Sequence, residues 1–142
     1  MVLFAKDVAE KVFLSLPRAT NSLEAAKMMK ETHQGFVIVS EGGSPEGIVT
    51  EWDYLSKIIA DGRDPAHVTL GELMTPGLIT VKGSDGLEAV ATTMTERGVR
   101  RVLVLQDGKV LGVITSRTIL ARLEEYVNRV STTIARLQAP PY

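Results

Sequence analysis

The chain has 142 residues, of which 44% are hydrophobic and 5% aromatic, and it contains no cysteine. This length supports one compact core built mainly from aliphatic residues, and the lack of cysteine excludes disulfides and thiolate metal sites. The net charge of −1 excludes a general attraction for nucleic acids. Because no apolar run reaches the roughly 20 residues of a membrane span and no signal-peptide pattern opens the chain, we expect a soluble, cytoplasmic protein.

The first half of the chain predicts alternating helices and strands. Thr20, Asn21 and Ser22 offer N-cap chemistry, and the glycine-rich stretch 42–45 is typical of a turn between strands. The expected elements are a helical lead (3–11), an extended segment (12–16), a helix (23–32), a buried strand (36–39), a second strand (47–50) and a helix (51–60) that ends at Asp61-Gly62.

The second half repeats this pattern. Gly47-Ile48-Val49-Thr50 returns as Gly112-Val113-Ile114-Thr115, 65 positions later. The expected elements are a short helix (70–74), a strand (78–81), a helix (87–97) ending at Gly98, and two strands (102–105 and 110–114) joined through the hairpin signal Asp107-Gly108. The sequence therefore predicts an α/β (α+β) fold of two β-α-β-β-α repeats, which pack about a pseudo-two-fold axis with a cleft between them.

The helix that starts at Ser116 carries apolar residues with a seven-residue period. They stand at Leu120, Leu123, Val127, Val130, Ile134 and Leu137, separated alternately by three and four positions. This spacing is typical of the seam between two packed helices. Two interpretations remain open: the seam folds back onto its own repeat, or it pairs with a partner chain. We expect the tail Ala139-Pro140-Pro141-Tyr142 to be disordered.

Thr50 and Asp53 are the first candidates for a functional site. Asp53 stands three residues after Thr50, which ends the expected strand. This spacing is typical of a helix capping box, which needs no ligand. The same geometry also suits a ribonucleotide, because helix N-terminal amides attract phosphate and a carboxylate accepts hydrogen bonds from ribose hydroxyls. The two interpretations are compatible.

Taken together, these motifs resemble a tandem pair of CBS domains. The resemblance rests on the two Gly-apolar-apolar-Thr strand ends, the run Leu70-Gly-Glu-Leu-Met-Thr-Pro and the run Gly-Val-Arg-Arg-Val-Leu-Val, and it spans residues 7–128. It implies a regulatory module that is not an enzyme and that senses an adenosine-containing ligand between the repeats. AMP is the expected ligand, ahead of ADP, ATP and S-adenosylmethionine, with no metal. The resemblance also implies a homodimer and a regulated protein partner that the sequence does not identify.

The resemblance assigns roles to individual residues. Asp53 would hold the ribose hydroxyls, and Thr50 would contact ribose or phosphate. The adenine would be bordered by Thr20 and the backbone at Gly35 and Phe36. Phosphate would be held by Arg101, with Arg100 beside it, and Thr115 would assist.

The second repeat departs from the family pattern, because Thr118 stands where the acid is expected. We therefore expect one good ribose site and one weak or vacant site. The alternative is a structural dimerisation module whose nucleotide sites have lapsed. The expected boundaries are repeat 1 (1–62), a linker (63–69), repeat 2 (70–128), and a helix extension with the tail (129–142).

Overall fold

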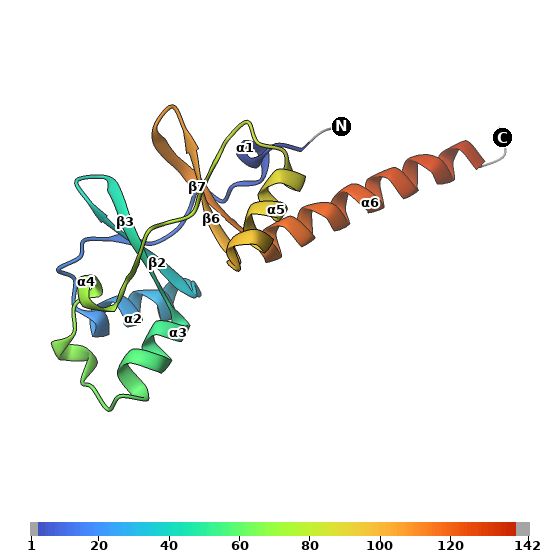
Figure 1. Ribbon diagram of the computed structural model, residues 1–142. Coiled ribbons are helices and arrows are strands. Elements are labelled where there is room, and N and C mark those ends of the chain that lie inside the picture. Colours follow the sequence, from blue (N-terminus) through green and yellow to red (C-terminus); the bar gives the residue numbers. More distant parts are fainter. Residues whose placement is uncertain (1–2, 139–142) are drawn as a thin grey trace. The chain divides into compact units, whose positions relative to one another are not determined.

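Two repeats of short strands and helices make up the computed structural model, which describes residues 3–138 (Figure 1). The chain divides into two packed units. The first unit comprises residues 11–79. The second unit comprises residues 80–138 together with 3–10, so the start of the chain packs with its second half.

The first unit is a four-stranded sheet with its helices. The sheet order is β1-β2-β3-β4, in which β1 is parallel to β2 and the other neighbours are antiparallel. The elements are β1 (Ser15–Leu16), α2 (Ser22–Thr32), β2 (Phe36–Glu41), β3 (Ser44–Thr50), α3 (Glu51–Tyr54) with a π-helical turn (Leu55–Ile59), a 3-10 turn (Pro65–His67), α4 (Leu70–Leu73) and β4 (Thr75–Pro76).

Aliphatic side chains from the helices and the sheet form the core of the first unit. Val37, Ile38 and Val39 of β2 are all almost fully buried, which confirms the prediction of a strand covered on both faces. The main core cluster comprises Ala25, Met29, Val37, Val39, Val49, Ile58, Val68, Leu70 and Leu73. Helix α2 begins where the Asn21 side chain accepts hydrogen bonds from the N–H groups of Leu23 and Glu24.

The second unit repeats this architecture with a three-stranded sheet of order β5-β6-β7. Its last helix is much longer than the equivalent helix of the first unit and extends well beyond its own sheet (Figure 1). The elements are α1 (Ala5–Val8), β5 (Thr80–Lys82), α5 (Leu87–Arg97), β6 (Arg101–Gln106), β7 (Lys109–Thr115) and α6 (Ser116–Gln138). Over residues 3–138 no helix has the length and apolarity to cross a bilayer.

The repeated glycine of the Gly-apolar-apolar-Thr motif has a packing role in both units. The backbone of Glu10 pairs with Val113 of β7, and Thr75 of β4 pairs with Ile48 of β3. A Cβ at Gly112 would lie 2.5 Å from the Glu10 carbonyl oxygen. A Cβ at Gly47 would lie 2.7 Å from the Thr75 carbonyl oxygen. Both strands therefore need glycine, because a second backbone crosses them at close range.

The structure confirms the two β-α-β-β-α repeats and the extended last helix. Several elements begin or end at residues other than those predicted. The lead helix is shorter than 3–11, and β5 starts two residues later than the predicted strand at 78. The predicted helix 51–60 is α-helical only to Tyr54, and its next turn widens so that the Ala60 N–H donates to the Leu55 carbonyl. The predicted disordered tail, 139–142, lies outside the described residues.

The seam of α6 does not pack on its own unit. All six of its apolar side chains are exposed, from 40% at Val130 to 82% at Leu137. The first of the two interpretations of this seam, that it folds back onto its own repeat, is therefore wrong.

Candidate functional site

The candidate ribose site is the junction between β3 and α3 in the first unit. The capping box predicted from the spacing of Thr50 and Asp53 is present. Asp53 Oδ2 accepts a hydrogen bond from the Thr50 backbone N–H at 2.8 Å and another from the Thr50 hydroxyl at 3.3 Å. Asp53 is only 5% exposed, and it is one of two buried polar residues in the described range. The carboxylate is therefore fixed in orientation at the start of a helix.

A lysine that the sequence analysis did not select completes this site. Lys57 Nζ lies 2.9 Å from Asp53 Oδ1 and donates to the Leu73 carbonyl oxygen at 3.0 Å. Both carboxylate oxygens of Asp53 thus have partners, but an ionised carboxylate has about four acceptor positions, and these contacts use three. The carboxylate retains the capacity to accept a hydrogen bond from a ligand. The i, i+4 spacing of an acid and a lysine is a signal that could have identified this pair.

Gly35 and Phe36, the residues predicted to border the adenine, lie beside Thr50. Phe36 pairs with Thr50 across β2 and β3, and the Gly35 carbonyl accepts from the Glu51 N–H at 3.1 Å. Thr20 does not lie at this junction. It follows the carboxyl end of β1, which runs parallel to β2, and its carbonyl accepts from the Leu70 N–H near α4. The structure thus brings together four of the five candidates in the first unit.

The equivalent junction in the second unit holds a different set of groups. Thr115 Oγ1 and Thr118 Oγ1 lie 2.8 Å apart, and the Thr118 N–H donates to Thr115 Oγ1 at 3.1 Å. The Thr118 hydroxyl also donates to Glu10 Oε1 at 3.1 Å. A carboxylate is therefore present at this junction, although it comes from the lead segment and not from α6.

The two arginines stand at the start of β6, next to this second junction. Arg101 pairs with Thr115 across β6 and β7. The Arg100 carbonyl accepts from the Ser116 N–H at 3.0 Å, which repeats the bond from Glu51 to Gly35. Arg100 is exposed and Arg101 half-buried. The structure brings Arg100, Arg101 and Thr115 together within the second unit.

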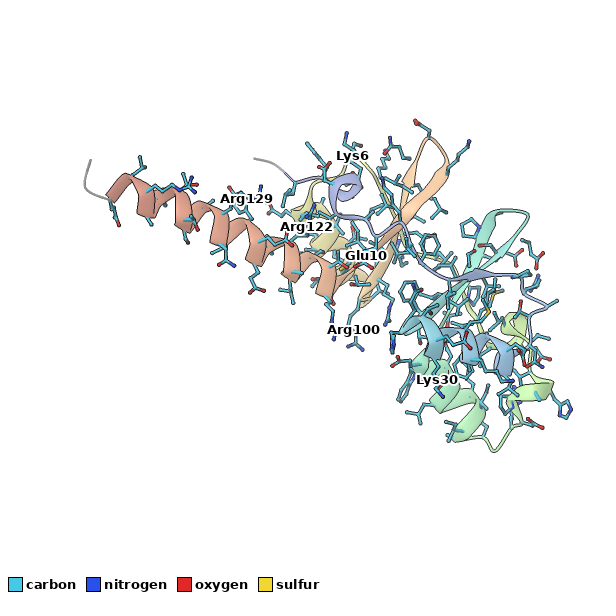
Figure 2. The ribbon with its side chains drawn as sticks, turned by 180° about the vertical axis from the view of Figure 1, so that it is seen from behind. Lys6, Glu10, Lys30, Arg100, Arg122 and Arg129 are labelled. Atoms are coloured by element: carbon cyan, nitrogen blue, oxygen red, sulfur yellow. The ribbon has the colours of Figure 1, made fainter. Side chains whose placement is uncertain are left out.

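Each unit also has a cavity. One of about 620 Å³ in the first unit lies between α2 and α3 and is lined by Lys30, His33, Gln34, Glu51 and Tyr54, among others. One of about 490 Å³ in the second unit lies between α1 and α6 and is lined by residues that include Lys6, Arg122, Tyr126 and Arg129. Figure 2 labels Lys6 on α1 and the two arginines on α6. Among residues 3–138, no three His, Asp or Glu side chains are grouped as metal ligands would be.

One side chain near the first cavity has a shifted pKa. Tyr54 donates its hydroxyl proton to the Ser22 carbonyl at 2.6 Å. Burial raises the pKa of Tyr54 to about 12, because the phenolate would lose hydration. Tyr54 is therefore a neutral hydrogen-bond donor at physiological pH, and it ties α3 to the start of α2.

Comparison with known proteins agrees with the duplicated fold. The CBS domain family matches residues 5–60 and 70–125, and this chain belongs to that family. Proteins built on a pair of CBS domains are regulatory modules that sense nucleotide or adenosyl ligands.

Solved structures and curated relatives support the assignment. The CBS domain pair of protein MJ0100, solved with 5′-methylthioadenosine and S-adenosyl-L-methionine, is 25% identical with a TM-score of 0.77, over 89% of this chain and 99% of that one. A hexameric CBS-CP12 protein from bloom-forming cyanobacteria is 31% identical with a TM-score of 0.76, over 84% of this chain and 71% of that one. Hypoxic response protein 1 of Mycobacterium tuberculosis is 30% identical over 72% of each chain.

Other relatives match only part of their own length. An uncharacterized protein of Methanopyrus kandleri is 31% identical over 85% of this chain and 62% of its own. A homoserine O-acetyltransferase of Methanocorpusculum labreanum is 33% identical over 74% of this chain but only 21% of its own. The chain thus spans from about a fifth to just under two thirds of the length of these relatives. The activity in the name of the acetyltransferase is therefore not assigned to this chain.

Proposed function

We propose that this chain is a regulatory module that binds an adenosine-containing ligand, with the ribose held at the junction of β3 and α3. The observation that carries the proposal is the buried, oriented carboxylate of Asp53, fixed by the Thr50 backbone N–H at 2.8 Å. A carboxylate held in this way accepts hydrogen bonds from the vicinal hydroxyls of a ribose without first losing conformational freedom.

The remaining contacts are proposed from the family resemblance. Gly35 and Phe36 would border the adenine, which agrees with their position beside Thr50. Arg101, Arg100 and Thr115 would hold the phosphate, so that AMP binds more tightly than adenosine. A charge-assisted hydrogen bond to phosphate contributes about 1.5–3 kcal/mol, which corresponds to roughly ten-fold to a hundred-fold in affinity.

The ligand would act through a difference in affinity between conformations. A bound nucleotide favours the conformation that binds it more tightly, and the equilibrium shifts by that difference in free energy and no more. We propose that the module works as a homodimer in the cytoplasm and transmits its occupancy to a regulated protein.

The decisive experiment varies both the ribose hydroxyls and Asp53. Isothermal titration compares AMP with 2′-deoxy-AMP on the wild type and on Asp53→Asn, with Asp61→Asn as a matched control at an exposed acid of the same unit. We expect the wild type and the control to bind AMP about ten-fold or more tightly than 2′-deoxy-AMP, and Asp53→Asn to lose that preference. Parallel titrations with ATP, adenosine and S-adenosylmethionine rank the ligands.

If the wild type and Asp53→Asn prefer AMP over 2′-deoxy-AMP by the same factor, the assignment of the ribose site is refuted. A melting curve of Asp53→Asn checks that the junction still folds, because the asparagine oxygen can still accept from the Thr50 N–H. Arg101→Ala should bind AMP and adenosine with similar affinities if the phosphate assignment holds.

The second candidate function is a structural interaction module without a nucleotide site. It is favoured by the contacts that already engage both oxygens of Asp53 and by the threonine at position 118. A thermal-shift measurement separates the two, because a ligand that binds the folded state must raise the apparent stability. If no adenosine-containing ligand raises the melting temperature at millimolar concentration, the result favours the structural function.

A further inference from the structure

We infer that α6 pairs with α6 of a second copy of this chain to form a two-stranded coiled coil. The inference goes beyond the ligand site and does not depend on it. It starts from the exposed seam of α6, namely Leu120, Leu123, Val127, Val130, Ile134 and Leu137.

Nothing in the described chain covers this seam. Every residue from 127 to 138 is exposed, whereas Ile119, one position before the seam, is buried in its own unit. The helix is 23 residues long and extends beyond the sheet of its unit (Figure 1). The apolar positions follow one stripe with alternating steps of three and four, which is narrower than the broad apolar face of a helix that lies on a membrane.

The outer half of α6 is not a strong helix former by itself. It carries β-branched residues at Val127, Val130, Thr132, Thr133 and Ile134, and such residues lose side-chain freedom in a helix. A short helical segment with this composition is marginal in water unless its apolar face is packed against a partner. A second helix along the seam supplies that packing.

The residue types in the seam favour two strands. If Leu120 is position a of the heptad, the a positions are Leu120, Val127 and Ile134, and the d positions are Leu123, Val130 and Leu137. Two of the three a positions are therefore β-branched, and two of the three d positions are Leu. β-Branched residues at a combined with Leu at d favour a two-stranded coil. An identical partner has the same heptad period by definition, so the two seams stay in register along their whole length.

The charges on α6 also permit self-pairing. Between residues 120 and 138, Glu124 is the one charged residue at the positions that flank the seam; the others are Tyr126, Ser131, Thr133 and Gln138. Three of the four arginines of α6, Arg122, Arg129 and Arg136, repeat at position c and lie outside the seam. Figure 2 shows Arg122 and Arg129 along α6, and both line the cavity beside α1. Two copies can therefore meet along the seam without an array of like charges.

The area of the seam is sufficient for a dimer that dissociates on dilution. The exposed fractions of its six side chains add up to about three fully exposed apolar side chains per helix, or roughly 400–700 Å² of apolar surface for the pair. With a polar rim of ordinary proportion, the interface totals about 1,000 Å², which is the size at which specific interfaces begin.

The experiment places a carboxylate inside the seam and, as a control, outside it. Val127→Asp puts two carboxylates in one layer of the coil, whereas Thr132→Asp puts the same residue at the outward position f of an equally exposed turn. Light scattering after size exclusion measures the mass of full-length protein without nucleotide, at several concentrations. We expect Thr132→Asp to keep the wild-type mass, and Val127→Asp to have at most half of it or to need at least about 100-fold more protein to reach it.

Ile134→Asp, one heptad farther from the folded unit, should behave like Val127→Asp and guards against a local folding defect. If both seam variants keep the wild-type mass, or if the wild type is a single chain at about 100 μM, the inference is wrong. Isothermal titration of Val127→Asp with AMP keeps the two proposals apart, because the proposed ligand site uses other residues and the AMP affinity per chain should be unchanged.

Discussion

Gly112→Ala tests the reason for the repeated glycine. The φ angle at Gly112 is not in the left-handed region, so the backbone conformation itself accepts alanine. Alanine would even be favoured over glycine in a strand by about 0.5–1 kcal/mol if space were available. The added Cβ, however, would lie 2.5 Å from the Glu10 carbonyl oxygen and 3.1 Å from Ala9 Cβ. The close contact with the Glu10 carbonyl oxygen therefore decides whether Gly112→Ala stabilises or destabilises the fold.

The cost of this contact can be worked from the structure. The neighbouring atom at 2.5 Å belongs to the backbone, so the lead segment as a whole has to shift. That shift weakens two backbone hydrogen bonds, from Glu10 N–H to the Val113 carbonyl at 2.9 Å and from Val113 N–H to the Glu10 carbonyl at 3.0 Å. Overpacking and weakened hydrogen bonds together should cost about 2–4 kcal/mol of unfolding free energy.

Thermal unfolding followed by circular dichroism measures this cost. For a chain of this size, we expect the midpoint of Gly112→Ala to fall by roughly 5–15 °C. Gly86→Ser is the control, because an added Cβ there meets no atom within 4 Å and serine is a good N-cap for α5. A midpoint of Gly112→Ala within about 1 °C of the wild type would refute the close-packing argument.

Two further substitutions test the other contacts described above. Thr118→Asp restores the family acid in the second unit but places it where the Thr118 hydroxyl now bonds to Glu10, at 3.1 Å. We expect urea unfolding to show a loss of about 0.5–1 kcal/mol, because like charges repel, and Glu10→Gln should recover it. Tyr54→Phe removes the hydroxyl bonded to the Ser22 carbonyl. The pKa of Tyr54 is about 12 in the folded state and 10.0 in the unfolded state. The contribution of the Tyr54 hydroxyl to stability is therefore complete below pH 10 and is lost as pH rises toward 12. Urea unfolding should show a wild-type advantage that shrinks between about pH 10 and pH 12, and a constant difference over this range would contradict the burial argument.

Local patterns allowed much of this structure to be predicted. The three-residue spacing of Thr50 and Asp53 predicted a capping box, and it is present. Gly98 ends α5 in the left-handed conformation, as expected from its position after the helix. The repeat of Gly47-Ile48-Val49-Thr50 at Gly112 predicted two equivalent units, and the equivalent strands pair with the same register. These signals depend on neighbouring residues, which a sequence shows directly.

Contacts between distant residues were not predicted. The bond between Glu10 and Thr118 joins residues 108 positions apart, and no local pattern indicates it. The displacement of Thr20 from the β3–α3 junction follows from the parallel direction of β1, which a two-residue strand does not reveal in its sequence. The assignment of ligand-binding roles to the candidate residues stays a prediction, for which the titrations above are the test.

The packing of residues 3–10 with the second half of the chain sets an order of events during synthesis. Residues 11–79 form a continuous segment that can fold as soon as it leaves the ribosome. The lead segment has to wait for β7, whose Val113 is made about 100 residues after Glu10. During this interval the apolar side chains of Ala5 and Val8, buried in the finished protein, stay in water. A nascent chain arrested before β7 should therefore leave its N-terminal residues open to a protease, and completion of β7 should close them.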